Sequence, residues 1–553
     1  MDDPLAGTAP PESAPRTGGT RRACTALGLV AAGLFLLLTT VNLDAQAPYY
    51  DELHQATGAF LWVGAGTPMF CEARLGRFCL LNMSYSGAIK TNLYGAYLRL
   101  TGHRFSLPSW RLFAIIPVAA AIVLFATMVY PALGAGSLAV VLVLLVTDVN
   151  VILNTRFDSG PVALSLVARL VLVALWIRGD VTAAGATPRN SLALGAITGL
   201  AVFEKLSAVV LIAGLLAALL GPGGRRTPRH AAAMSAGLGL GLAPLVAINA
   251  FTLATEGAVV SLTDVATRDT ASGGFLVHLG RYLSLGQGAA AKVSILAAAT
   301  PAWALRAEGA LVAGLAALVA VAAIGSGACR RLRLAGVMLV TYGAIAIGLY
   351  LLPRRIKFHH LALGTPYQYA AVGLALAAAG WSLRSSAALR AVRPLLVILV
   401  AALFGLRVVA VWPVEARLAR GTAGLAYDAS LRDIALFAAA RRDTAVFVAS
   451  DWGVATQIYA YSGGDAGLVF EPFWRYAGVR ELHEFQRRAG KDVLYVVRLR
   501  RPEMVRAEAT RRIEYDLATD GAWQEVEPEP EVRDLHAVFV QKYVYRPAVA
   551  PGR

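Results

Sequence analysis

Cysteine and charge are both scarce in this sequence. Four cysteines occur among 553 residues, and none stands in a CxxC pair or in the Cys/His spacing of a zinc site. Charged residues make up only 16% of the chain against 57% hydrophobic residues, which excludes a soluble protein whose whole surface faces water. A structural metal site is therefore not expected, and the composition requires a lipid bilayer as solvent.

Acidic residues are especially scarce in the first three quarters of the chain. Of the 35 acidic residues, 15 precede Trp412 and 20 follow it. The net charge of +16 comes largely from arginines scattered between apolar segments, where they orient membrane helices. We therefore expect no nucleic-acid partner, and we expect a separate water-soluble domain at the C-terminal end.

Long apolar segments predict eleven membrane-spanning helices after a disordered cytoplasmic tail at residues 1–23. The predicted spans, each bounded by polar or basic residues, are 24–43, 109–129, 132–152, 159–178, 191–203, 205–220, 231–251, 308–326, 333–352, 363–382 and 394–412. The predicted fold is an all-α polytopic membrane domain over residues 24–412. A soluble α/β domain follows over residues 413–553, where strands are expected at 445–450, 493–497 and 537–544.

The segment 191–220 decides the predicted topology, because it is short for two helices across a ~30 Å core and generous for one. If it crosses twice, as a hairpin turning at residues 203–205, the arginine-rich loops lie on the cytoplasmic side. The loops then predicted outside, with the C-terminal domain, are 44–108, 154–160, 252–307 and 353–362. The expected location is the bacterial plasma membrane, with the active site extracytoplasmic.

Three acidic residues, in two segments of the chain, fall at the predicted outer membrane edge. Asp51 and Glu52 follow the first span, where a carboxylate can deprotonate an acceptor hydroxyl or help to bind a divalent cation. The alternative is a solvated helix start, since acids are favourable near a helix N-terminus. Asp158 lies between two spans, where an ionisable group is costly unless it is functional or paired, with Arg156 as the local partner.

A basic cluster departs from the positive-inside trend, because the topology places it outside. Its members share one short segment: Arg354, Arg355, Lys357, His359 and His360. Arginine and lysine at the membrane edge suit a lipid phosphate. If the span count is wrong by one, the cluster is an ordinary cytoplasmic loop.

The hairpin tip and the first outer loop carry further candidates. Glu204 and Lys205 either neutralise each other at the tip or leave Lys205 facing the same phosphate. Cys71 and Cys79 both lie in the first outer loop and are expected to form a structural disulfide in an oxidising compartment.

The order of these motifs resembles that of the GT-C glycosyltransferases, and most of all the protein O-mannosyltransferase and aminoarabinose-transferase branch. The likeness covers residues 24–412. It rests on Tyr-Asp-Glu-Leu-His at 50–54, Lys90 and Tyr94, Arg111-Leu112, Asp158, the segment from Gly199 to Lys205, and Lys357-Phe358-His359-His360 followed by Pro366. The sequence departs from many relatives at residues 84–90, where they carry His-Pro-Pro, which leaves the acceptor open.

The resemblance implies an inverting transfer of a hexosyl or pentosyl group from a polyprenyl-phosphate donor to a glycan, lipid or protein hydroxyl in the cell envelope. Asp51 would be the catalytic base, with a Mg or Mn ion at Asp51 and Asp158 as a further expectation. Glu52, His54, Lys90 and Tyr94 would organise the acceptor side. The donor phosphate would be held by Arg354, Arg355, Lys357, His359, His360 and Lys205.

Two other functions are compatible with the sequence. A transporter or lipid flippase would line a pathway with intramembrane charges, whereas most of these charges lie at one membrane face. A non-catalytic scaffold of the same fold would tolerate replacement of Asp51.

Overall fold

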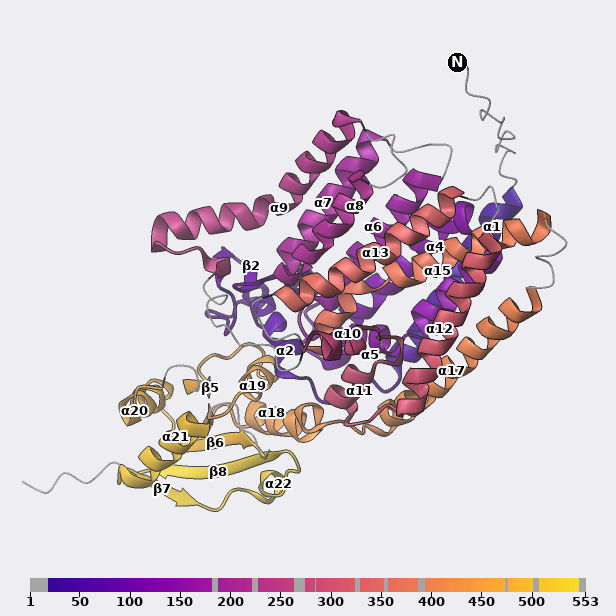
Figure 1. The fold of residues 1–553 in the computed structure, drawn as a ribbon. Helices are drawn as coiled ribbons and strands as arrows, with labels where there is room; N and C mark the ends of the chain where they lie inside the picture. Colours follow the sequence, from indigo (N-terminus) through magenta and orange to yellow (C-terminus); the bar gives the residue numbers. More distant parts are fainter. Residues whose placement is uncertain are drawn as a thin grey trace, which may run out of the picture.

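The chain folds into a tilted bundle of long helices with a small α/β unit packed against one end (Figure 1). The computed structural model describes residues 18–181, 187–220, 227–262, 274–283, 285–323, 329–352, 357–385, 393–472, 476–500 and 507–546. We call the end of the bundle that carries the α/β unit the domain face. No membrane orientation is implied by this name.

The bundle is formed by the long helices α1 (Gly18–Thr40), α4 (Leu107–Val146), α6 (Val162–Val181), α7 (Pro188–Glu204), α9 (Pro228–Glu256), α12 (Ala302–Ala323), α13 (Cys329–Leu351), α15 (Tyr367–Ser385) and α17 (Arg393–Arg420), together with the shorter α8 (Ile212–Leu220). Short helices gather near the domain face: α2 (Tyr50–Leu53), η1 (His54–Val63), α3 (Ile89–Thr101), α5 (Val149–Phe157), α10 (Phe275–Leu283), α11 (Ala289–Leu296) and α14 (Phe358–Leu361). The bundle core is almost entirely aliphatic and aromatic.

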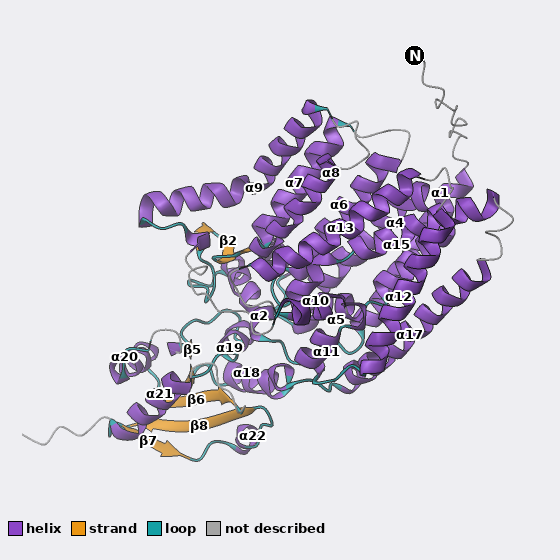
Figure 2. Ribbon diagram, in the orientation of Figure 1, coloured by secondary structure: helices purple, strands orange, loops and turns teal. Residues whose placement is uncertain are grey.

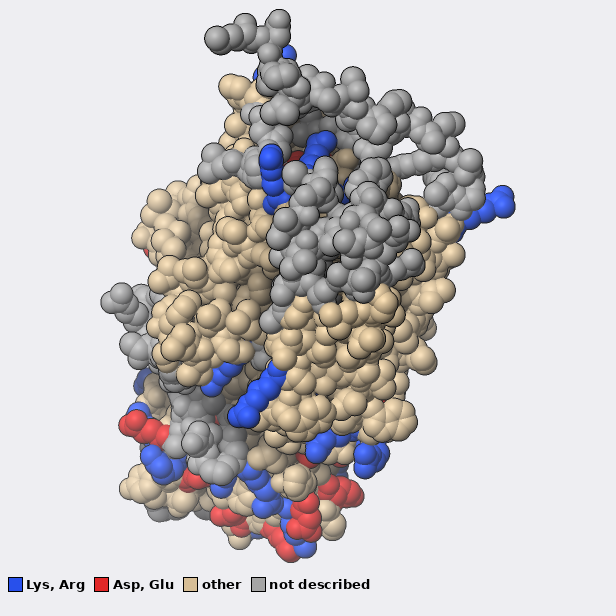
Figure 3. Space-filling model, turned by 45° about the vertical axis from the view of Figure 1, so that its right-hand side comes forward, with Lys and Arg blue, Asp and Glu red and all other residues tan. Residues whose placement is uncertain are grey.

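Six helices in the described part of the chain are long and apolar enough to cross a membrane: α1, α4, α6, α9, α13 and α17. Charged side chains gather at the two ends of the molecule, and a broad uncharged belt lies between them (Figure 3). The chain is therefore an integral membrane protein. The predicted count of eleven spans is not confirmed. The predicted span 109–129 and most of the predicted span 132–152 lie in the 40 residues of α4, which is kinked at Gly134 (φ 72°). The second of these spans continues past the end of α4 into α5.

The segment 191–220 forms the predicted hairpin. Helix α7 ends at Glu204, and Lys205 adopts an extended conformation (φ −149°, ψ 110°). The chain then turns through η2 (Leu206–Leu211) into α8, which rises beside α7 (Figure 1). The turn is held by the Leu206 amide, which donates to the Tyr85 carbonyl at 3.0 Å. Lys205 is thus placed near the domain face.

The first loop contains a small antiparallel sheet, with strands in the order β1 (Ala73–Leu75), β2 (Phe78–Met83) and β3 (Ser86–Gly87). Cys71 and Cys79 are joined by a disulfide, as the sequence suggested. The sheet leads into α3, and α3 packs along η1 through the Gly95–Trp62 and Gly58–Thr91 contacts. The later part of this loop is therefore folded against η1, the helix that follows α2.

The α/β unit is built on a five-stranded sheet whose order is β5–β4–β6–β8–β7. The strands are β4 (Ala445–Ala449), β5 (Val469–Phe470), β6 (Val493–Leu499), β7 (Trp523–Val526) and β8 (Val538–Tyr545). The first three strands of that order are parallel, and β8 and β7 are antiparallel additions. Helices α18 (Ser430–Ala440), α19 (Ala455–Tyr461), α20 (Val479–Ala489) and α21 (Ala507–Thr519) flank the sheet (Figure 2). Helices on both faces explain why every residue of β4 is buried.

Candidate functional site

The site is centred on Asp51, in the first turn of α2. Its Oδ2 atom lies 3.3 Å from the Nζ atom of Lys357, the residue that caps the N-terminus of α14. The Asp51 side chain is 15% exposed and that of Lys357 is 48% exposed. A carboxylate in this position is screened from bulk water yet open to a ligand.

Asp158 occupies the turn between α5 and α6 in a left-handed conformation (φ 36°). Its Oδ1 atom accepts from the amides of Val162 and Ala163, each at 2.9 Å, and so caps the start of α6. Its Oδ2 atom lies 2.7 Å from the Nζ atom of Lys90, in a pair almost fully shielded from solvent. The alternative in which Asp158 forms a salt bridge with Arg156 is therefore wrong.

Arg156 points the other way, toward the end of α1. Its guanidinium donates to the carbonyls of Thr39, Val41 and Asn42 and to the side chain of Gln46. The Thr39 carbonyl belongs to the last turn of α1 and has no partner inside the helix, and Val41 and Asn42 follow directly after the helix. Arg156 is therefore a structural residue that joins α5 to α1.

The Asp51 and Asp158 segments are hydrogen-bonded to each other. The Gly160 amide donates to the Asp51 carbonyl at 3.3 Å, and the Gln55 side chain donates to the Asp158 carbonyl at 2.8 Å. Lys205 enters the same space, because a Cβ atom at Gly160 would lie 2.8 Å from its Nζ atom. Two carboxylates and three lysines from five segments of the chain therefore converge.

Glu204 does not neutralise Lys205. Its Oε2 atom instead accepts from the Ile89 amide at 3.2 Å, at the start of α3. The alternative of a Glu204–Lys205 ion pair is therefore wrong, and the lysine charge is directed toward the two aspartates.

Two buried histidines border this group. His54 lies within electrostatic range of Asp51, Asp158, Lys205 and Lys357, and burial lowers its pKa to about 4. Neither ring nitrogen of His54 has a hydrogen-bond partner among the described residues, nor does Nδ1 of His359. Burial also lowers the pKa of His359 well below its usual value. Buried polar atoms require a partner, and a bound ligand, an ion or water can supply it at these positions.

The other predicted residues are distributed differently. His360 accepts a hydrogen bond from the Lys357 amide at 3.1 Å, and its ring lies 4.2 Å from that of His359 at an angle of 43°, so it shapes the α14 turn. Tyr94 does not belong to the group of aspartates and lysines, because its ring packs against Trp110 and its hydroxyl is hydrogen-bonded to the Ser109 hydroxyl. Arg354 and Arg355 lie outside the described residues.

Glu52 is fully buried and faces away from Asp51. Its two oxygens accept from Nε and Nη2 of Arg111 at 2.8 and 3.0 Å. The Nη1 atom of Arg111 also donates to the carbonyls of Leu43 and Gln46. This network fixes α2 against α4, and Glu52 thereby positions the residue before it.

Sequence reasoning missed Trp452, which follows strand β4 in the α/β unit. Its ring lies 5.4 Å from that of Tyr49 and 4.9 Å from that of Tyr50. The Nζ atom of Lys357 lies 5.1 Å from the ring centroid. The α/β unit therefore contributes an aromatic wall to the site. The one local signal was a Trp at the carboxyl end of a buried strand, where functional residues of parallel sheets gather.

The expected divalent cation fits this arrangement poorly. Asp51 and Asp158 each form an ion pair with a lysine, and Asp158 also accepts hydrogen bonds from two backbone amides. No group of three or more metal-ligating side chains occurs within the described ranges. A cation would have to displace Lys90 and Lys357, so we derive no step through a metal.

The fold is that of ArnT, an aminoarabinose transferase of the GT-C family, as the resemblance predicted. The chain matches ArnT from Cupriavidus metallidurans in the apo state with a TM-score of 0.60 and 13% identity, over 94% of this chain and 98% of that one. It matches the same enzyme bound to undecaprenyl phosphate with a TM-score of 0.58 and 14% identity, over 93% and 97% of the two chains. No family model and no curated protein sequence matches the chain.

Proposed function

We propose that this protein is a glycosyltransferase that uses a polyprenyl-phosphate sugar. The observation that carries the proposal is the Asp51 carboxylate, partly exposed beside Lys357 and Lys205 near the domain face. The ArnT fold supports it, since one ArnT structure holds undecaprenyl phosphate. A base next to cations is the arrangement that transfer from a phosphate leaving group needs.

In the proposed reaction, Asp51 takes the proton of the acceptor hydroxyl. The hydroxyl oxygen attacks the anomeric carbon as the bond from that carbon to the phosphate oxygen breaks. The configuration at the anomeric carbon is therefore inverted. The electron pair leaves with the polyprenyl phosphate, whose added negative charge is met by Lys205 and Lys357. His54, neutral at pH 7 because its pKa is about 4, offers a hydrogen bond to the bound sugar.

The remaining residues support this chemistry. Lys90 neutralises Asp158, and that pair holds the turn over which Lys205 lies. We propose that Arg354 and Arg355 add to the phosphate-binding charge, as their position before Lys357 indicates. The sugar is a hexose or pentose, and the acceptor is a glycan, lipid or protein hydroxyl.

We further propose that the domain face is extracytoplasmic and that the membrane is a bacterial plasma membrane. The Cys71–Cys79 disulfide supports this orientation, because disulfides persist in oxidising compartments. The arginines at 330, 331 and 333 begin α13 at the opposite end of the bundle, in agreement with a cytoplasmic position.

A donor panel tests the function. Purified protein is incubated with radiolabelled polyprenyl-phosphate hexoses and pentoses and with membrane extract, with and without a chelator. We expect transfer from one donor class, unchanged by the chelator because the lysines already neutralise both carboxylates. Polyprenyl-pyrophosphate sugars serve as the control, and transfer from none of the phosphate donors would contradict the proposal.

Trp452 gives a second prediction, on the role of the α/β unit. Trp452→Ala should lower kcat/KM about tenfold. The substitution removes the ring contacts with Tyr50 and Lys357, and these contacts contribute about 1–2 kcal/mol to holding Lys357 in place in the transition state. Trp452→Phe should retain most activity. Trp523→Ala, on the far strand β7, is the matched control for domain stability. Equal kcat/KM for Trp452→Ala and the native protein would remove Trp452 from the site.

A further inference from the structure

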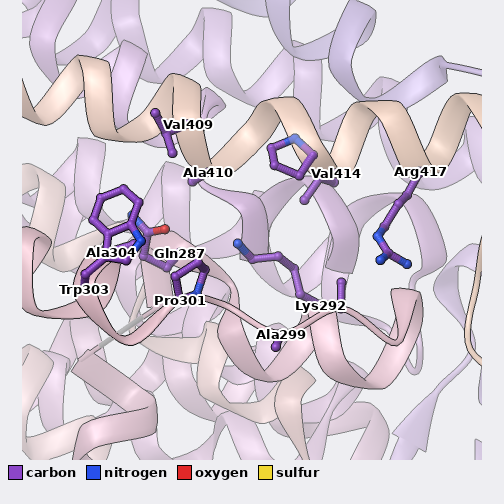
Figure 4. Close-up of a pocket in the computed structure, with 12 residues that line it drawn as sticks. Gln287, Lys292, Ala299, Pro301, Trp303, Ala304, Val409, Ala410, Val414 and Arg417 are labelled. Carbon is purple, nitrogen blue, oxygen red and sulfur yellow. The ribbon is translucent and has the colours of Figure 1, made fainter.

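A second polar feature lies outside the reaction site, between α11, the start of α12 and the last turns of α17 (Figure 4). It is a pocket of about 120 Å³. Its walls are mostly apolar and include Trp303, Pro413 and Val414. Its polar lining is formed by Gln287, Lys292 and Arg417.

Lys292 brings a buried cation to this pocket. The residue is only 5% exposed, and no carboxylate lies within salt-bridge distance of it in the described part of the chain. The Glu308 carboxylate acts on the Lys292 charge from a longer distance, because Glu308 forms its ion pair with Arg407 at 2.8 Å. Burial lowers the pKa of the Lys292 ammonium to about 8, so the group is still mostly protonated at pH 7.

Gln287 supplies a second donor without a partner. It is 1% exposed, and its amide nitrogen has no hydrogen-bond partner among the described residues. Arg417 contributes a further positive charge, although one of its nitrogens donates to the Leu296 carbonyl at 3.0 Å. A buried ammonium and an unpaired amide in one pocket match the oxygens of an anion.

Exposed tryptophans lie at the pocket. Trp303 in its wall is 57% exposed, and the nearby Trp412 of α17 is 74% exposed. Exposed tryptophans near the ends of membrane helices are typical of the headgroup level of a bilayer. Apolar walls at that level can contact the first carbons of an acyl chain, whereas a small water-soluble anion makes no apolar contact with them.

The pocket is separated from the reaction site by α11. Ala291 and Ile295 of that helix pack on Val149 and Ile152 of α5, in one buried apolar cluster. Asp158 lies beyond the other end of α5, about 13 Å away along the helix axis at a rise of 1.5 Å per residue. A ligand in the pocket therefore does not occupy the Asp51 site.

We propose that this pocket binds the phosphate group of an anionic membrane phospholipid. Lys292 and the Gln287 amide donate to the phosphate oxygens, Arg417 adds long-range attraction, and the acyl chains follow the apolar surface of α17. The inference rests on the membrane location of the chain and is independent of the proposed transfer reaction.

The test is lipid binding by the detergent-solubilised full chain, measured by native mass spectrometry. The probes are phosphatidylglycerol, zwitterionic phosphatidylcholine and polyprenyl phosphate, and inorganic phosphate is tested by thermal shift. We expect phosphatidylglycerol to bind most tightly. Lys292→Met should weaken that binding about tenfold, the loss expected for one charge-assisted hydrogen bond. Lys292→Arg should retain it, and so should Arg420→Gln, a change in the exposed last turn of α17.

A second variant keeps the test decisive if Lys292→Met does not fold. Val409 lines the pocket and is 50% exposed, so Val409→Trp narrows it with little disturbance of the core. Unchanged phosphatidylglycerol binding by both variants would overturn the proposal. Equal binding of phosphatidylcholine would do the same, because the charge would then not be recognised. Preferential binding of polyprenyl phosphate, or an equal effect of inorganic phosphate, would reassign the pocket to another anion.

Discussion

Asp51→Asn is expected to lower transfer by about 10²- to 10⁴-fold, the usual contribution of a general base. The amide keeps the size of the side chain and can still accept a hydrogen bond from Lys357, but it cannot take the acceptor proton. The measurement is initial rate of sugar transfer from the active donor, at matched protein amount. Thermal stability should change little, because the carboxylate is partly exposed and its ion pair is 3.3 Å long.

Asp44→Asn is the matched control for this change. Asp44 also follows α1, its side chain is 55% exposed, and it lies 3.5 Å from Arg432 rather than in the site. It should transfer sugar at the native rate. Native transfer by Asp51→Asn would instead show that a residue other than Asp51 takes the acceptor proton.

Arg111→Gln is expected to destabilise the protein by about 3–5 kcal/mol, the cost of leaving a buried ion without its partner. The substitution strands the Glu52 carboxylate, which is fully buried, together with the carbonyls of Leu43 and Gln46. The free energy of unfolding, from denaturant titration in mild detergent, measures this effect. Transfer should also fall, since Glu52 holds the helix that carries Asp51.

A double-mutant cycle separates the ion pair from the rest of the network. Glu52→Gln with Arg111→Gln should be less destabilising than the sum of the two single changes, because the stranded charge is gone. Arg99→Gln, an exposed change in α3, should have no measurable effect. Additive losses in the double variant would show that the two side chains are not energetically coupled.

The sequence predicted the arrangement of the hairpin because a physical constraint acted on a local segment. The mostly apolar segment 191–220, which contains Glu204 and Lys205, was too short for two ordinary spans, and the positive-inside trend favoured two crossings. The structure turns the chain at Lys205. The strands β4, β6 and β8 were likewise predicted from runs of β-branched residues, which are a local signal.

Pairings between distant segments could not be predicted in the same way. Asp158 and Lys90 were both recognised as candidates, yet their ion pair depends on where the fold places the start of α3 relative to the turn between α5 and α6. Arg156 was considered as the local partner of Asp158 in the alternative of a structural salt bridge, because it is close in sequence, although residues two apart on a helix do not face each other. Trp452 lies 401 positions after Asp51, and nothing in the sequence near either residue indicates that they meet.

The hairpin also makes the length of α7 a functional quantity. Because Lys205 directly follows the last residue of this 17-residue helix, its position depends on the number of residues as much as on their identity. One inserted residue would carry the lysine 1.5 Å further along the axis and rotate it by about 100°. The ammonium would then point away from Gly160 and the two aspartates. The length of α7 therefore sets the position of Lys205 in the site. Related chains that keep this lysine should also keep the number of residues in the helix before it.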